Sequence, residues 1–234
     1  MRNTEINRVV ISKIAHALGD INEEVVYVGG AVVSLYINDP AADDVRPTKD
    51  IDLSMSVVTL GELERMRQRL TSRRFIQTFE DEVICRFRYD DVLVDFMNTK
   101  ALGWAPANPW FGPGYLHCQR MAIGTQEIRL LPLSYFMATK FSAFESRGQG
   151  DPRTSHDFED VVYVLDNRID LVEELQGMRG AIASFLQHRF ELILEDAVFR
   201  EAVSAHLFYE NRAARTTVIF GKLKRLVSLL KSSG

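Results

Sequence analysis

The spacing of apolar residues predicts a helix, a strand, a glycine turn and a second helix at the start of the chain. Apolar positions recur at helical intervals over residues 4–18, and Gly19 follows where a helix end favours glycine. A β-branched run at residues 25–28 then predicts a short strand. Gly29-Gly30 end that strand, and residues 31–37 form an apolar stretch of helical length.

The next strand carries two acidic residues on one side. Residues 38–49 are rich in Asp, Ala and Pro and predict a loop, after which residues 50–57 alternate as a strand. In such a strand Asp50 and Asp52 share one face, because successive side chains point to opposite sides. The two carboxylates are therefore expected close together.

Further along, the pattern predicts an arginine-rich helix and then a hairpin. The helix covers residues 61–73, and the hairpin arms are residues 84–87 and 92–97 around the turn Tyr89-Asp90-Asp91. Asp95 would lie in the second arm. Residues 100–118 hold prolines, glycines and aromatic residues and predict an irregular connection, and one more strand is expected near residues 127–131.

After Pro132 the periodicity is helical almost throughout. The expected helices cover residues 133–147, 155–166, 169–176, 179–195, 197–209 and 213–231. The fold class is therefore α+β: a mixed sheet flanked by helices in residues 1–131, followed by a helical bundle in residues 132–234.

Composition indicates a folded globular protein. Apolar residues make up 46% of the 234 residues and charged residues 26%, and the net charge is −4. No apolar window is long enough to span a membrane and no signal peptide is evident, so we expect a soluble cytoplasmic protein without membrane contact. Cys85 and Cys118 have no metal-ligand spacing and predict free thiols.

The glycine pair and three carboxylates form the pattern with the clearest chemistry. Asp50 and Asp52 on one strand, with Asp95 on another, could share divalent cations in a two-metal site of the kind used in phosphoryl transfer. Gly29 and Gly30 have no Cβ, so the backbone there could approach a triphosphate closely. A plain turn and a solvated acidic strand are the alternatives for each part taken alone.

The order of these motifs resembles the DNA polymerase β-like nucleotidyltransferase superfamily. Its signature is a hydrophobic residue with Gly-Gly, then Asp-x-Asp, then an isolated carboxylate between hydrophobic residues. Val28-Gly29-Gly30, Asp50-Ile51-Asp52 and Val94-Asp95-Phe96 match these three parts. The resemblance is closest to the AbiEii/AbiGii toxin type, in which an arginine and a Ser or Thr precede the acidic pair, as Arg46 and Thr48 do here.

A second similarity to that type lies downstream. The family carries Lys-x-x-Ala-x-x-x-Arg on a helix and then Arg-Asp-x-x-Asp, which Lys140, Ala143, Arg147, Asp157 and Asp160 match. Two positions depart from the pattern. His156 replaces the arginine and cannot act as a permanent bidentate fork. Ala31 stands where a hydroxyl residue often follows the glycines, and Ser34 one turn later is the substitute candidate.

The resemblance implies Mg²⁺-dependent transfer of a nucleoside monophosphate from an NTP such as ATP. Asp50 and Asp52 would bind both metal ions, and Asp95 would bind the catalytic metal and help deprotonate the acceptor hydroxyl. The nucleotide-binding set would comprise Gly29, Gly30, Ser34, Arg46, Thr48, Lys140, Arg147 and Asp157. Solvation is the alternative for Lys140, and helix capping is the alternative for Arg147 and Asp157.

The acceptor implied by the resemblance is an RNA such as tRNA or a protein hydroxyl, in a toxin–antitoxin or phage-defence setting with a cognate antitoxin. Five arginines within residues 65–74, and six basic residues with no acidic one in residues 211–234, favour a polyanionic acceptor; solvated or packing helices are the alternative. Two rival functions remain: a nucleotidyltransferase for a small molecule such as an antibiotic, and a catalytically silent nucleotide-binding module.

Overall fold

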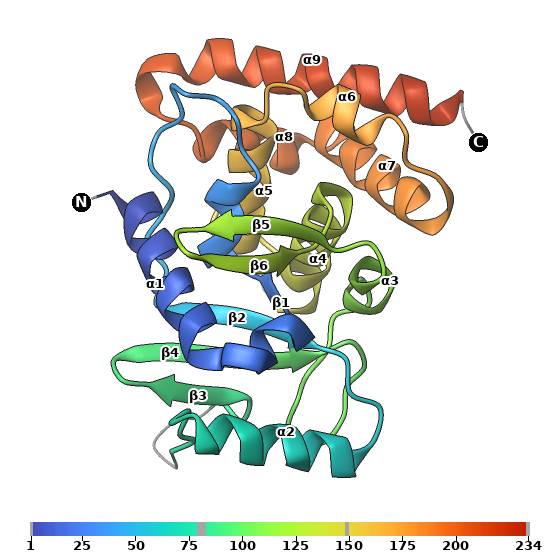
Figure 1. Cartoon of the computed structure of the whole chain (residues 1–234). Coiled ribbons are helices and arrows are strands. Elements are labelled where there is room, and N and C mark those ends of the chain that lie inside the picture. Colours follow the sequence, from blue (N-terminus) through green and yellow to red (C-terminus); the bar gives the residue numbers. More distant parts are fainter. Residues whose placement is uncertain (1, 79–82, 148–149, 233–234) are drawn as a thin grey trace. The chain divides into compact units, whose positions relative to one another are not determined.

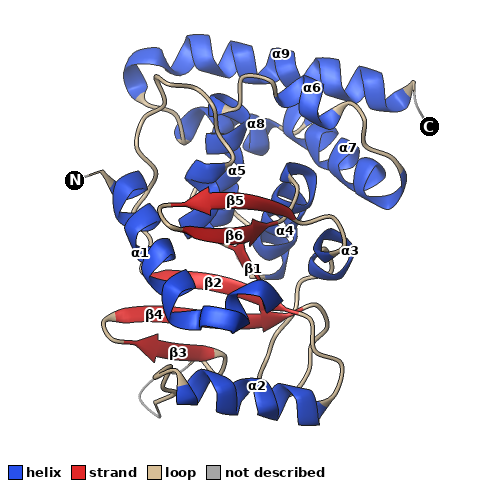
Figure 2. Ribbon diagram, viewed as in Figure 1, coloured by secondary structure: helices blue, strands red, loops and turns tan. Residues whose placement is uncertain are grey.

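The computed structural model describes residues 2–78, 83–147 and 150–232 and divides into two compact units. Unit 1 comprises Met1–Ser34 and Asp44–Pro132, and unit 2 comprises Leu35–Asp43 and Leu133–Gly234. Unit 1 holds a mixed six-stranded sheet with helices around it, and the remaining long helices belong to unit 2 (Figure 2). The α+β class predicted from the sequence is confirmed.

The sheet of unit 1 has the strand order β3-β4-β2-β1-β6-β5 (Figure 1). Its strands are β1 (Val25–Val28), β2 (Asp50–Met55), β3 (Arg86–Tyr89), β4 (Val92–Asn98), β5 (Gln119–Ile123) and β6 (Gln126–Leu130). β2 runs parallel to β4 and antiparallel to β1, and β1 runs parallel to β6. The two hairpins, β3–β4 and β5–β6, therefore form the two sides of the sheet.

The first helix of unit 1, α1 (Asn3–Leu18), ends as its sequence predicts. Its inward positions, among them Ile11, Ile14 and Leu18, are fully buried. Gly19 follows with φ of 55°, a left-handed conformation that glycine adopts without a steric penalty. A short 3₁₀ turn, η1 (Gly19–Glu24), then leads into β1.

The helix expected at residues 31–37 is instead a six-residue 3₁₀ turn, η2 (Gly30–Leu35). Val32 and Val33 are β-branched and disfavour an α-helix, and both are buried, so the segment has no solvent-facing side. The glycine turn is therefore not followed by an α-helix N-terminus.

The strand expected near residues 127–131 is one arm of a hairpin, and its partner β5 was missed. β5 alternates weakly, with only Ile123 fully buried, and it lies at an edge of the sheet. Gly124 with φ of 61° makes the turn between the arms. Within the irregular connection at residues 100–118, one short helix forms, α3 (Phe111–Tyr115).

The β3–β4 hairpin is packed by aromatic side chains. Phe87 lies edge-on to Phe96 with ring centroids 5.2 Å apart, and Phe75 lies 6.1 Å from Phe96. Helix α2 (Leu60–Ser72) precedes them and begins with a capping box, in which Thr59 Oγ1 accepts from the Glu62 amide. These contacts hold the strand that carries Asp95.

Unit 2 consists of helices together with the segment Leu35–Asp43. Its helices are α4 (Leu133–Ser146), α5 (His156–Asn167), α6 (Leu171–Leu175), α7 (Gly180–Glu195), α8 (Ala197–Ala205), η3 (Tyr209–Asn211) and α9 (Arg212–Lys231). The Tyr36 ring stacks on that of Phe136 with centroids 4.2 Å apart, and Arg215 lies 3.6 Å from Asp39. Residues 35–43 thereby pack with the helices of unit 2.

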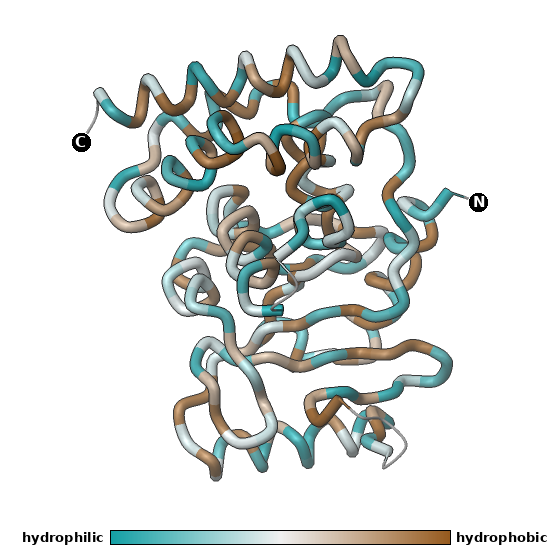
Figure 3. Tube along the Cα trace, turned by 180° about the vertical axis from the view of Figure 1, so that it is seen from behind, coloured by the Kyte–Doolittle hydropathy of each residue, from teal (hydrophilic) through white to brown (hydrophobic). Residues whose placement is uncertain are grey.

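Helix α9 is an amphipathic packing helix. Hydrophobic and hydrophilic segments alternate along it (Figure 3). Its buried positions are Ile219, Leu223, Leu226, Val227 and Leu230. No helix in the described part of the chain is both long enough and apolar enough to cross a membrane.

Candidate functional site

The three carboxylates predicted as metal ligands lie on two neighbouring strands of unit 1. Asp52 on β2 is the register partner of Asp95 on β4, and Val28, which precedes the glycine turn, is the partner of Asp52 on the other side. Asp50 is two residues before Asp52 on the same strand and so shares its face. Strand pairing therefore brings together the glycine turn, the Asp-x-Asp pair and the isolated carboxylate.

An arginine that the sequence reading overlooked binds two of these carboxylates. Arg86 Nε donates to Asp95 Oδ1 at 2.8 Å, and its Nη2 donates to Asp95 Oδ2 at 2.7 Å. The same Nη2 also donates to Asp50 Oδ2 at 2.9 Å. The guanidinium thus forms a fork on Asp95 and a bridge to Asp50, which is the strongest geometry available to an arginine–carboxylate pair.

The hairpin register contains a signal that would have revealed Arg86. With Asp90-Asp91 as a two-residue turn, counting back from Tyr89↔Val92 gives Arg88↔Leu93, Phe87↔Val94 and Arg86↔Asp95, as the structure has them. Asp90 adopts φ of 50°, the left-handed conformation that such a turn requires. An arginine directly across from the isolated carboxylate was therefore predictable.

Gly29 is required because the Asp52 side chain lies against its Cα. Gly29 has φ of 73°, and a Cβ built on it would lie 1.8 Å from Asp52 Oδ2. Real side chains cannot approach so closely, so any other residue would displace the carboxylate. Here the glycine makes room for Asp52.

Gly30 is required for a second close approach, by the loop that leads into β2. A Cβ on Gly30 would lie 2.6 Å from Arg46 Nη2 and 3.0 Å from Thr48 Cγ2. Arg46 and Thr48, both predicted site residues, therefore lie beside the glycine turn. Arg46 brings a positive charge to the same region as Asp52.

The loop that carries Arg46 and Thr48 is attached to helix α1. The Asp44 carboxylate accepts hydrogen bonds from the backbone amides of Asn3 and Thr4, and Thr48 Oγ1 donates to Asn7 Oδ1 at 3.1 Å. Burial alone would raise the pKa of Asp44, but these bonds from Thr4 and Asn3 lower it below its ordinary value. The first turn of α1 thus holds the loop in place.

Ser34, the substitute hydroxyl candidate, is enclosed by protein. Its side chain is 8% exposed, and its Oγ has no hydrogen-bond partner among the described residues. A phosphate contact from Ser34 stays a prediction, and the arrangement described does not present the hydroxyl to solvent.

The predicted residues of unit 2 contact one another in a charge cluster. Lys140 Nζ lies 2.8 Å from Asp160 Oδ2 and 3.2 Å from Asp157 Oδ1, and Arg147 Nη1 lies 2.8 Å from Asp157 Oδ2. The Lys140, Asp157 and Asp160 side chains are each at most 6% exposed. Lys140 is therefore not the solvated helix lysine that was its alternative reading; its ammonium neutralises two buried carboxylates.

Arg147 is the exposed member of this cluster. Its side chain is 72% exposed, and with His156 and Asp157 it lines a pocket of about 250 Å³ in unit 2. His156 pairs with Glu159 one turn along α5 and not with Asp157. Ser155 caps α5 by accepting from the Phe158 amide, so capping does not need Asp157.

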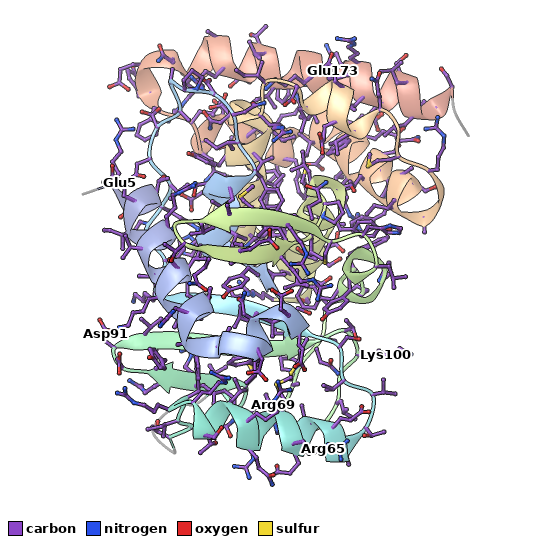
Figure 4. All side chains as sticks on the ribbon, in the orientation of Figure 1. Glu5, Arg65, Arg69, Asp91, Lys100 and Glu173 are labelled. Atoms are coloured by element: carbon purple, nitrogen blue, oxygen red, sulfur yellow. The ribbon has the colours of Figure 1, made fainter. Side chains whose placement is uncertain are left out.

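The basic runs that favoured a polyanionic acceptor are largely paired inside each unit. On α2, Arg67 pairs with Glu64 and Arg69 with Asp20 and Glu24, and directly after this helix Arg73 pairs with Asp20 and Arg74 with Asp90. Figure 4 shows Arg65 and Arg69 projecting from this helix. Acidic residues, several of them distant in the sequence, therefore offset much of the local positive charge.

The basic residues of α9 are used in the same way within unit 2. Lys222 Nζ donates to the carbonyls of Leu165, Asp166 and Arg168 at 2.8, 3.1 and 2.9 Å and so caps the end of α5. Arg215 binds Asp166, Arg225 pairs with Glu173, and Lys231 pairs with Glu191. Lysine and arginine here contribute to packing, which was the alternative interpretation of this segment.

The acidic cluster of unit 1 suits a magnesium ion in the chemistry of its donors. All three are carboxylates, the ligands that Mg²⁺ prefers, and one cationic atom, Arg86 Nη2, already bridges Asp50 and Asp95. Within residues 2–78, 83–147 and 150–232, no three His, Cys, Asp or Glu side chains converge as a ready-made metal site. The donors suit a cation by their chemistry alone, and in this structure the cation between Asp50 and Asp95 is the Arg86 guanidinium.

Comparison with known proteins adds one similarity. No family model matches the chain, and no curated protein matches it. Among solved structures, it is similar to the crystal structure of an antigenic nucleotidyltransferase-like protein from Paracoccidioides brasiliensis. The TM-score is 0.48 and the sequence identity 19%, over 85% of this chain and 92% of that one. The function proposed below is carried by this chain's own residues.

Proposed function

We propose that this protein is a Mg²⁺-dependent nucleotidyltransferase that transfers a nucleoside monophosphate from an NTP to an acceptor hydroxyl, with pyrophosphate as the leaving group. The observation that carries the proposal is the pairing of Asp52 with Asp95 on adjacent strands, directly beside the Gly29-Gly30 turn. The motif order resembling the polymerase β-like superfamily supports it. Three carboxylates on one face of a sheet repel one another, and bound cations would neutralise that repulsion.

In this reaction Asp50 and Asp52 would bind the two metal ions, with Asp95 as the third ligand. The metal ions supply charge stabilisation for the attacking and leaving oxygens of an in-line displacement. Asp95 would also accept the proton of the acceptor hydroxyl. Arg46, beside Gly30, would contribute positive charge toward the phosphates as they approach the turn.

The acceptor and the biological role follow from the resemblance to toxin-type enzymes. We propose an RNA such as tRNA, or a protein hydroxyl, as the acceptor, and a cognate antitoxin as the partner that restrains the activity. A small-molecule acceptor is the rival, since most basic residues of α2 and α9 are paired internally. The assay must therefore offer all three acceptor classes side by side.

The test is transfer of label from each of four α-labelled NTPs, with Mg²⁺, to total tRNA, to the protein itself and to an aminoglycoside. Asp52→Asn should abolish transfer and keep the unfolding temperature of the parent, because it removes one of several like charges. Asp91→Asn is the matched control, since Asp91 lies in the exposed β3–β4 turn, 86% accessible, and pairs with Lys13 (Figure 4). Transfer by Asp52→Asn at the parent rate would overturn the proposal.

Toxicity can be tested separately from chemistry. Induced expression of the parent chain should slow bacterial growth, whereas Asp52→Asn should not. Equal growth with both proteins would remove the toxin role and leave the enzymatic proposal to the labelling experiment.

A further inference from the structure

One guanidinium binds both oxygens of Asp95 and one oxygen of Asp50. We propose that Arg86 is a built-in counter-ion of the acidic cluster, and that it competes with the divalent cation for Asp50 and Asp95. This inference rests on the proposed function, because it takes the cluster to be the metal site. In this proposal Arg86 does not bind the metal ion itself, but it lowers the affinity of the carboxylates for that ion.

The first step concerns charge. Asp50, Asp52 and Asp95 carry three negative charges on adjacent strands, and like charges on one face of a sheet destabilise it unless they are neutralised. Arg86 sits across from Asp95 in the hairpin register and supplies a fixed positive charge. In the absence of metal, the Arg86 side chain therefore neutralises part of the negative charge of this cluster in the folded state.

The second step concerns burial. The side chains of Arg86 and Asp95 are 19% and 12% exposed, so their charges interact with limited screening by water. An exposed surface pair such as Arg67 with Glu64, at 42% and 46%, is screened and contributes little. The Arg86 fork is thus strong enough to affect a competing equilibrium.

The third step concerns competition for the same atoms. The three N–H groups of Arg86 point at Asp95 Oδ1, Asp95 Oδ2 and Asp50 Oδ2, which are oxygens of the carboxylates proposed as metal ligands. A divalent cation placed there would also be repelled by the guanidinium charge. Metal binding must therefore displace at least part of the fork, and the free energy of breaking it lowers the affinity for metal.

The experiment measures Mn²⁺ binding to the full chain by calorimetry, without nucleotide. Arg86→Gln should bind Mn²⁺ at least about tenfold more tightly than the parent, because both the repulsion and the competition are removed. Arg86→Lys should lie between the two, since it keeps the charge and loses the fork. Arg67→Gln, the same charge change at an exposed helix position, should match the parent.

Unfolding temperatures give a second readout that does not depend on turnover. In EDTA, Arg86→Gln should unfold below the parent, since the three carboxylates lose their counter-ion. Added Mn²⁺ should raise its unfolding temperature by more than it raises that of the parent. If Arg86→Gln does not fold in EDTA, Arg86→Lys carries the comparison.

The failure of this inference differs from failure of the proposed function. Mn²⁺ binding by the parent, with unchanged or weaker binding by Arg86→Gln and Arg86→Lys, would overturn the counter-ion role alone. Absence of Mn²⁺ binding by the parent and by both Arg86 variants would overturn the metal site and the inference with it. Asp52→Asn locates the bound ion, because binding at the cluster must weaken when that carboxylate is removed.

Discussion

The carboxylate of Asp52 lies so close to the Cα of Gly29 that no side chain fits between them. A Cβ at residue 29 would be 1.8 Å from Asp52 Oδ2, and the residue has a positive φ of 73°. The glycine turn and the acidic pair, far apart in the sequence, are thus parts of one packing arrangement. Any side chain larger than hydrogen at residue 29 would therefore displace the Asp52 carboxylate.

Gly29→Ala should destabilise unit 1 by at least about 2 kcal/mol, from backbone strain and displacement of Asp52. Chemical denaturation measures this loss. The matched control is Gly221→Ala in α9, where a Cβ has no neighbour within 4 Å; it should stabilise by about 0.5–1 kcal/mol.

A double-mutant cycle separates the two contributions at Gly29. Asp52→Ala removes the carboxylate that the new Cβ would meet, so Gly29→Ala should cost less in that background than in the parent. The remaining cost then reports the strain of the positive φ. Additive losses would mean that the contact with Asp52 does not explain the glycine.

Lys140→Met should destabilise unit 2 by about 3–5 kcal/mol, because Asp157 and Asp160 would be left buried without their shared cation. Arg147→Gln, which removes the exposed cation from the same cluster, should cost less than about 1 kcal/mol. Urea denaturation of the two variants provides the comparison. Similar losses would contradict the central position of Lys140.

This result also determines how Lys140 can be probed in catalysis. A raised KM for NTP in a Lys140 variant can be interpreted only without denaturant and at a temperature where that variant is shown to be folded. Arg147, at 72% exposure, is the better position for testing a phosphate contact, because we expect its removal to leave the fold largely intact.

Lys222→Ala should destabilise unit 2 by about 1–3 kcal/mol, since three carbonyls at the end of α5 lose their donor. Lys224→Ala, two residues along α9 and exposed, should change stability by less than about 0.5 kcal/mol. Thermal unfolding monitored by circular dichroism checks both. Equal stabilities would contradict the capping role of Lys222.

The lowered pKa of Asp44 predicts that the stability of the protein depends on pH. Its pKa in the folded state lies below the ordinary 3.8, so its contribution is complete above that value and disappears as the pH falls through the folded pKa. Asp44→Asn cannot titrate. The parent should therefore be more stable than the variant at pH 6, and the difference should narrow below about pH 4.

The measurement is the unfolding temperature of parent and variant from pH 6 to pH 2. Asp43→Asn, at the neighbouring exposed aspartate, controls for the change in net charge. A difference between parent and Asp44→Asn that stays constant or widens in acid would contradict the role of the Asp44 carboxylate at the α1 N-terminus.

The sequence predicted most of the local structure, with the helix at residues 31–37 as an exception, but it did not predict long-range pairing. The alternation of Asp50 and Asp52 and the glycine after α1 follow from backbone geometry alone, and both are confirmed. That β2 pairs in parallel with β4, so that Asp52 meets Asp95, depends on tertiary packing. The weakly alternating β5 was missed because its conformation comes from pairing with β6.

Charge was the hardest property to predict from the sequence. Arg69 and Arg73 find Asp20 and Glu24 only after folding, and Lys140 lies on a helix whose neighbouring positions Met137, Ala138 and Phe141 are all buried. A run of like charges in the sequence therefore gives little information on the surface potential, because acidic partners come from distant segments.

The position of β3 in the sheet determines how Arg86 could separate from Asp50 and Asp95. β3 is a four-residue edge strand that pairs with β4 on one side and with a single bridging residue, Ile76, on the other, whereas Asp95 and Asp52 lie on inner strands. Edge segments open by local fluctuations at a lower free energy than central strands do. We therefore expect that Arg86 can leave the carboxylates by fraying of β3 without global unfolding, and amide hydrogen exchange in this strand would measure that local opening.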